Sequence, residues 1–246
     1  MADYEIVIPC ATKDKNKVNF ALASAAKYLH PTPKDFHVIC QDTLNVDCHM
    51  HNEVDVLNLN PTQSRYRRPR WIYQQFLKLF NNVTSTDYYM VVDSDLIFNK
   101  DIQVFNDDGL PYFFLGSIDH NHAPDFAFLQ HLFGFGRAYP HSFTVEFMLI
   151  DKKIRDDIIK PWGNVEDFYN KVCAIINYDG KPYRMNDYET YGNFTYTHFP
   201  TAYDFRKIKS KLFHIYNRDW TNAEIIQLVE KMRPSEYDVF TYHTWV

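Results

Sequence analysis

Two carboxylates, Asp93 and Asp95, stand two residues apart directly after an apolar run from Tyr88 to Val92. The run predicts a buried strand, and ligands of open α/β sheets gather beyond the carboxyl ends of strands. Carboxylate oxygens suit hard divalent cations, and a cation bound there could clamp a diphosphate. The alternative is that Asp-Ser-Asp is only a polar turn. The apolar residues before and after the motif favour the functional interpretation.

A second polar pattern lies just upstream, where Arg70, Gln74 and Lys78 recur every four residues. At about 100° per residue these three side chains share one face of a helix expected over 68–80. The opposite face is apolar and is expected to pack on the sheet: Ile72, Phe76, Leu79 and Phe80. The polar stripe could be an ordinary solvated face. Two glutamines and the arginines at 65, 67, 68 and 70 make a ligand-facing helix the other interpretation.

Glycine is scarce: the 246 residues include only 7 Gly, beside 18 Tyr and 20 Phe. No G-x-G-x-x-G dinucleotide fingerprint and no P-loop can be read in the chain. A net charge of -5 argues against general nucleic-acid binding, which requires a basic face. Any phosphate group must therefore be held by side chains or a cation, without a glycine-rich loop.

The cysteines and the lengths of the apolar runs indicate the cellular location of the protein. Cys10, Cys40, Cys48 and Cys173 form no C-x-x-C pair and are expected to be reduced. No apolar run reaches the roughly 20 residues that span a bilayer, and the first residues do not resemble a signal peptide. These features predict a cytoplasmic protein without a membrane span.

The elements that must position these residues alternate between strands and helices in the first half of the chain. Strands are expected at 4–9, 36–40, 54–59 and 88–92, with helices at 18–29 and 68–80. In the second half, strands are expected at 112–115, 143–150 and 237–245, and helices after Asp151, Asn164 and Thr221, which are good N-caps. The pattern predicts one α/β domain over 1–246. Its central sheet would be mostly parallel and Rossmann-like, flanked by helices, with a mixed C-terminal part.

Taken in order, a first strand ending in a polar loop, an R-x-x-x-Q-Q-x-x-K helix at 70–78 and Asp-Ser-Asp resemble a GT-A type glycosyltransferase. More narrowly, the set is similar to small sugar transferases of bacteria and of large DNA viruses, such as those of chlorella viruses. The segment 186–193, N-D-Y-E-T-Y-G-N, is similar to the S-E-x-E-x-Y-G segment of that family, with Asn and Asp in place of Ser and Glu. The resemblance spans about residues 4–245. It implies a nucleotide-binding half over about 1–100 and an acceptor-binding half over about 101–246.

The resemblance implies transfer of a sugar from a nucleotide-diphosphate sugar to a hydroxyl of a glycan or glycoprotein. Mn²⁺ or Mg²⁺ would be bound by Asp93 and Asp95, with Asp95 the more direct ligand. A histidine from a late strand would add a further ligand: either His243, preferred because it closes the last strand, or His214. The donor would contact residues from the first strand, the helix and the motif: Pro9, Thr12, Asp14, Arg70, Gln74, Lys78, Asp93 and Ser94.

An inverting transferase needs one carboxylate as general base beside the acceptor hydroxyl. Glu189 is the first candidate, Asp187 the second and Glu146 the third, although Glu189 could instead brace a loop before Gly192. A non-catalytic nucleotide-sugar or carbohydrate-binding module with the same fold is the main alternative. A nucleotidyltransferase is a weaker one, because its usual glycine-rich phosphate loop is missing. If the chain is viral, its expected location is the host cytoplasm.

Overall fold

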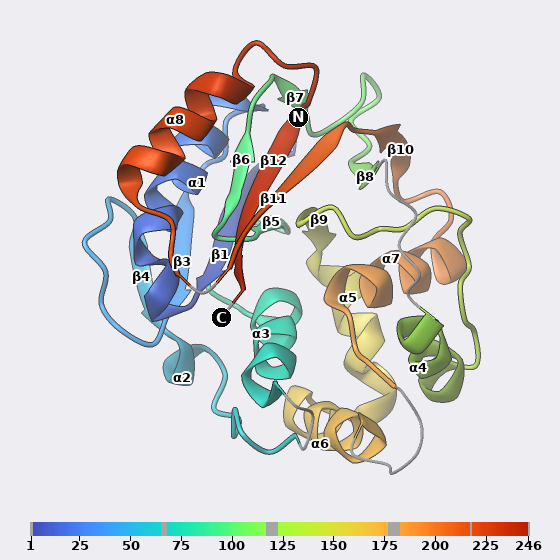
Figure 1. Cartoon of the computed structure of the whole chain (residues 1–246). Helices are drawn as coiled ribbons and strands as arrows, with labels where there is room; N and C mark the ends of the chain where they lie inside the picture. Colours follow the sequence, from blue (N-terminus) through green and yellow to red (C-terminus); the bar gives the residue numbers. More distant parts are fainter. Residues whose placement is uncertain (1, 65–67, 117–122, 177–182, 217, 246) are drawn as a thin grey trace.

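A mostly parallel sheet forms the centre of the computed structural model, which describes residues 2–64, 68–116, 123–176, 183–216 and 218–245 (Figure 1). Within these ranges the strand order is β4-β3-β1-β5-β9. The strands are β1 (Tyr4–Cys10), β3 (Phe36–Cys40), β4 (His49–Asn52), β5 (Tyr88–Val92) and β9 (Phe147–Asp151). β1, β3, β4 and β5 are parallel, whereas β9 runs antiparallel to β5. The α/β class is confirmed, with one antiparallel edge strand.

Helices cover both faces of this sheet, which explains why every residue of β1 is buried. On one face, Ile6, Val38 and Met90 pack with α1 (Lys15–Tyr28). On the other, Val7 and Val91 pack in a core shared with α3 (Pro69–Phe80) and the helices of the second half. The carboxyl ends of β1 and β5 therefore lie between α1 and α3.

The strand expected at 54–59 is wrong. The Asn52 side chain accepts a hydrogen bond from the backbone N–H of Val54 at 3.0 Å and caps the short helix α2 (Glu53–Val56). The alternating apolar residues do not form a buried face, since Val54 is 54 % exposed. The strand beside β3 is instead β4, whose histidines carry a weak strand signal but pair with β3 in parallel register.

Smaller sheets and a group of helices complete the fold. β12 (Val239–Trp245) lies between β11 (Ser210–Tyr216) and β6 (Leu96–Phe98), parallel to the first and antiparallel to the second. β8 (Tyr112–Leu115) pairs with β10 (Asp204–Lys207), and β2 (Leu29–His30) with β7 (Ile102–Gln103). The helices are α4 (Ala123–Phe133), α5 (Lys152–Ile159), α6 (Val165–Ile176), α7 (Asp187–His198) and α8 (Asn222–Met232). None of the helices in the described ranges is long and apolar enough to cross a bilayer.

The predicted helix starts are confirmed. Asp151 accepts from the N–H of Lys153, Asn164 from that of Asp167, and Thr221 forms a capping box with Glu224. The strand expected at 143–150 begins only at Phe147, because Glu146 adopts a left-handed backbone conformation, with φ of 67°. The sequence patterns predict neither α4 nor α7.

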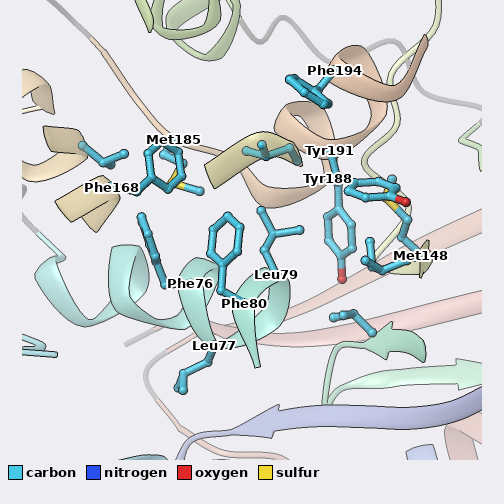
Figure 2. Close-up of a cluster of buried hydrophobic side chains, with 14 of the residues drawn as sticks. Phe76, Leu77, Leu79, Phe80, Met148, Phe168, Met185, Tyr188, Tyr191 and Phe194 are labelled. Carbon is cyan, nitrogen blue, oxygen red and sulfur yellow. The ribbon is translucent and has the colours of Figure 1, made fainter. Parts of the chain in front are cut away.

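α3 packs on the sheet, as expected, but it is also covered on its other side by the helices of the second half. Phe76 and Phe80 contact Phe168 of α6, with ring centroids 5.5 and 5.6 Å apart. Figure 2 shows these two rings directed toward Phe168 and Met185, while Leu77 leaves the opposite side of the helix. α3 thus lies between β1 and the helices of the second half (Figure 1).

Candidate functional site

A polar pocket of about 400 Å³ opens at the carboxyl ends of β1 and β5. Residues from α1, α3, β12 and the loops after both strands line it: Ala11, Lys13, Asp14, Lys17, Arg68, Trp71, Gln74, Asp93, Ser94, Asp95 and His243. A second cavity, of about 280 Å³, adjoins it and shares Ala11, Lys13, Arg68, Trp71 and Gln74. We call them the acidic pocket and the side cavity. Their position agrees with the expectation that ligands bind at this edge of the sheet.

The Asp-Ser-Asp motif is both a turn and part of the pocket wall. The carbonyl of Asp93 accepts from the N–H of Leu96 at 3.0 Å, which closes the turn, and the N–H of Asp93 donates to the carbonyl of Glu146 at 2.9 Å. The carbonyl of Asp95 accepts from the N–H of Tyr242 at 3.2 Å, which fixes the motif against β12. The turn therefore directs Asp93, Ser94 and Asp95 into the acidic pocket.

The two aspartates have different partners. Asp93 Oδ1 lies 2.6 Å from Lys78 Nζ and accepts from the Tyr188 hydroxyl at 2.8 Å. Asp95 has His243 as its ion-pair partner, with Oδ2 3.7 Å from Nε2. Burial raises the pKa of Asp95 to about 7, and Asp93 and Glu146 add to the rise although His243 opposes it. The charge of Asp93 is thus balanced by a lysine, whereas burial disfavours the ionised form of Asp95.

Lys78 does not face the pocket, although its spacing with Arg70 and Gln74 placed it on the ligand-facing side. Its side chain is buried between Asp93 and Asp187, the latter at 3.4 Å. Burial alone would lower the pKa of Lys78, but the two carboxylates outweigh burial and raise it. Asp187 is equally buried, and burial raises its pKa to about 6 in spite of Lys78. This buried group ties α3 to α7 behind the pocket.

His243 lines the pocket beside Asp95, and Glu146, which is not among the lining residues, contacts His243. His243 Nε2 lies 3.2 Å from Glu146 Oε1. Burial would lower the pKa of His243, but the hydrogen bond that it donates to Glu146 and the charge of Asp95 raise it to about 9. His214, the other candidate ligand, pairs with His243 across β11 and β12, with ring centroids 6.0 Å apart, but it is exposed and is not among the lining residues. The geometry therefore favours His243.

The donor set at this edge fits a hard divalent cation. Among the described residues, no group of three or more His, Cys, Asp or Glu side chains is already arranged to hold a metal ion. Mg²⁺ associated with a nucleotide, however, takes one or two carboxylates and completes its shell with phosphate oxygens and water. Asp95 and His243 place an oxygen and a nitrogen 3.7 Å apart, and the His243 nitrogen would bind a cation after losing its proton. Asp93, held by Lys78 and Tyr188, is less available than the sequence indicated.

Glu189 is a brace inside the protein. It is 1 % exposed. Oε1 accepts from the Ser142 hydroxyl at 2.5 Å, the Phe143 N–H at 3.1 Å and the Thr144 hydroxyl at 3.3 Å, and Oε2 accepts from Asn193 Nδ2 at 3.0 Å. These donors attach the loop before β9 to α7. The arrangement favours the structural interpretation of Glu189 over a role as general base.

The remaining predicted donor contacts divide between the two cavities. Asp14 lines the acidic pocket, Gln74 lines both cavities, and Pro9 and Arg70 line the side cavity, where Arg70 pairs with Glu53. Thr12 is exposed, donates to Asp42 at 2.8 Å and lines neither cavity. Arg65 and Arg67 lie outside the described residues.

The sequence reasoning missed Lys13, Lys17 and Trp71, as well as Ala11, among the residues that line the acidic pocket. Lys13 and Lys17 come from the start of α1 and the turn before it, and Trp71 from the first turn of α3. The spacing of Lys13 and Lys17, one helical turn apart directly after the first strand, was the available signal. Trp71 carried none, because an aromatic residue beside an apolar stripe is ordinarily read as core.

In comparisons with known proteins, no family model matches the chain and no curated protein is significantly similar to it in sequence. The functional argument therefore depends on the site itself.

Proposed function

We propose that the protein is a metal-dependent glycosyltransferase that moves a sugar from a nucleotide-diphosphate sugar to a hydroxyl of a glycan or glycoprotein. One observation carries the proposal: Asp95 and His243 line the same pocket as Lys13, Lys17 and Arg68. A ligand that complements such a pocket carries both a cation and negatively charged groups. A nucleoside diphosphate with its divalent cation has this composition.

The two cavities suggest how the donor lies. Asp95 and His243 would hold Mn²⁺ or Mg²⁺ in the acidic pocket. When bound, the cation would stabilise the negative charge that develops on the leaving diphosphate. The side cavity, with Pro9, Ile39 and Tyr73 in its wall, suits the flat apolar faces of a nucleoside. Trp71 and Gln74 line both cavities and would contact the donor where its nucleoside meets its phosphates.

Glu146 is the candidate base that this geometry supports best. A general base must come within hydrogen-bond reach of the acceptor hydroxyl. Glu189 is enclosed by donors and Asp187 is buried against Lys78, whereas the Glu146 side chain is 21 % exposed beside His243. Its positive φ is an outlier of the kind that proteins retain at functional sites. In transfer, the acceptor oxygen would attack the anomeric carbon, the bond from that carbon to the diphosphate would break, and Glu146 would take the hydroxyl proton.

The test measures binding and turnover separately. Calorimetric titration with UDP and with GDP, each with and without Mn²⁺, should show binding that depends on the cation. Incubation with UDP- and GDP-sugars should then release the nucleoside diphosphate. Asp95→Ala should remove the cation-dependent part of binding, and the exposed turn residue Asp108 provides the control Asp108→Ala.

Three results would contradict parts of the proposal. Binding without hydrolysis or transfer for any donor would support the non-catalytic module. Transfer of a nucleoside monophosphate group to an acceptor would support a nucleotidyltransferase. Full cation-dependent binding by Asp95→Ala would remove Asp95 from the metal site.

A further inference from the structure

Lys17 is a buried lysine whose side chain contributes to the wall of the acidic pocket. It is the third residue of α1 and is 2 % exposed. Its Nζ lies 2.6 Å from Oδ1 of Asp14, another lining residue, and 5.9 Å from the centroid of the Tyr242 ring. Burying an ammonium group costs free energy that ion pairing does not regularly recover. A buried cation kept at a pocket wall is therefore a candidate for ligand binding.

The lysines of the pocket and two of its aspartates come from different segments, although Asp14 lies between Lys13 and Lys17 in the sequence. Lys13 and Lys17 come from the start of α1 and the turn before it, whereas Asp93 and Asp95 come from the turn after β5. Lys17 and Asp95 line the same pocket. One anion in the pocket could therefore contact both the Lys17 ammonium and a cation held by Asp95.

Lys17 and Lys78 are both buried, but they differ in their position relative to the cavities. Lys78 lies between two carboxylates, Asp93 and Asp187, and lines neither cavity. Lys17 pairs with Asp14, and both residues line the pocket. Asp14 thus holds the Lys17 ammonium at the wall, and Lys13 adds a further positive charge to the same side of the pocket.

We infer that Lys17 binds the diphosphate of the donor in the acidic pocket, with Asp14 holding its ammonium in place. The inference deepens the proposed function and rests on it, because it takes the anion to be the diphosphate of a nucleotide. Lys17 would share the negative charge of the leaving diphosphate with the cation. No glycine-rich loop is needed for this arrangement, in keeping with the seven glycines of the chain.

The test compares ligands that differ only in phosphate. The wild type, Lys17→Met and Lys17→Gln are titrated with UDP, GDP, uridine, guanosine and inorganic pyrophosphate, all with Mg²⁺. Loss of one charge-assisted contact should weaken binding of the diphosphates and of pyrophosphate by roughly 10- to 100-fold. Binding of the free nucleosides should not change. Lys15→Met is the matched control, because Lys15 is exposed on the same helix and lines neither cavity.

The outcomes separate this inference from the proposed function. Lys17→Gln can still donate to Asp14, so it keeps the test available if Lys17→Met does not fold. Equal weakening of nucleoside and diphosphate, or no weakening of either, would overturn the role of Lys17 while cation-dependent donor turnover by the wild type still supports the transferase. Weakening confined to the phosphate-bearing ligands supports it. If the wild type binds neither UDP, GDP nor pyrophosphate, both proposals are refuted.

Discussion

The variant Glu189→Gln distinguishes a brace from a catalytic base by exchanging one carboxylate oxygen for an amide nitrogen. The amide oxygen takes the place of Oε1, which receives three hydrogen bonds, and the amide nitrogen then faces Asn193 Nδ2, which is also a donor. Asn193 cannot turn its amide over to relieve the conflict, because its Oδ1 already accepts from the N–H of Ala138 at 2.8 Å. Two donors are therefore left facing each other in a buried site.

The cost follows from the hydrogen bonds that change. Hydrogen bonds to a charged group contribute about 1.5–3 kcal/mol each, and a buried polar group left without its partner costs about 1–3 kcal/mol. The variant weakens the bonds to Oε1 and loses the one to Oε2, so we expect the free energy of unfolding to fall by about 2–4 kcal/mol. For a chain of this length each kcal/mol corresponds to about 2–4 °C, which gives a fall in Tm of roughly 4–16 °C.

The assay is urea and thermal unfolding of the wild type, Glu189→Gln and Glu166→Gln, followed by transfer measured well below the unfolding midpoint. Glu166 is exposed in the first turn of α6, so its variant should stay within about 0.5 kcal/mol of the wild type. Wild-type stability of Glu189→Gln together with a loss of transfer by about 10²–10⁴-fold would refute the brace and restore Glu189 as the base.

Two further predictions concern packing and pH. A Cβ on Gly192 would lie 2.3 Å from Cγ of Phe143, so Gly192→Ala should lower the free energy of unfolding by about 1–3 kcal/mol in a urea titration. Gly136→Ala, whose Cβ would meet no atom closer than 3.6 Å, should have a smaller effect, and equal effects would contradict this reasoning. Burial lowers the pKa of His37. Burial alone would raise the pKa of its partner Glu5, but the hydrogen bonds that Glu5 accepts from Ser85 and His37 outweigh burial and lower it. As the pH falls, both residues therefore become protonated in the unfolded chain before they do in the folded one. The free energy of unfolding should fall below about pH 6.5 because of His37, and fall further below about pH 4.3 because of Glu5. The fall should be smaller in His37→Gln, and an equal fall would exclude this pair as its source.

Elements with local signals could be predicted from the sequence. The apolar runs of β3, β5 and β8 have the expected bounds, and the cap residues Asp151 and Thr221 begin helices where their hydrogen-bonding side chains indicate. These signals depend on residues within one turn or one strand of each other. Tertiary contacts are not needed to read them.

Elements defined by their surroundings could not be predicted. α7 carries Thr, Asn and Gly in its interior, and residues from Asp187 to Thr195 are buried in succession. A helix that is enclosed on all sides has no apolar stripe opposite a polar face, so the sequence does not show the 3.6-residue hydrophobic period that would predict it. β4 is the converse case: His49–Asn52 has little strand propensity and becomes a strand because β3 offers an edge to pair with.

The candidate site shows the same division. Asp95, Ser94 and Gln74 could be placed in the pocket because strand ends and helix faces follow from local pattern. Lys78 satisfied the same face rule and is nevertheless buried. A periodic stripe specifies the direction of a side chain, whereas only the fold decides whether that direction leads to solvent, a ligand or a carboxylate.

The contacts of α3 connect three segments of the sequence: the 70–78 helix motif, Asp-Ser-Asp and the segment 186–193. Lys78 of the R-x-x-x-Q-Q-x-x-K helix lies 2.6 Å from Asp93 of Asp-Ser-Asp and 3.4 Å from Asp187 of the segment 186–193. Gln75 accepts from the N–H of Asp187 at 3.0 Å, and Tyr188 donates to Asp93 at 2.8 Å.

Each motif thus contributes some residues to one buried network and leaves others for the pocket. Gln75 faces α7 while Gln74 lines both cavities, and Asp93 is held by Lys78 while Asp95 lies beside His243. A change in the network would move the turn that carries Asp95 without touching a ligand. The spacing of the motifs therefore serves to position the pocket as well as to supply its chemical groups. The residues that would contact the donor are sequence neighbours of the residues in the buried network.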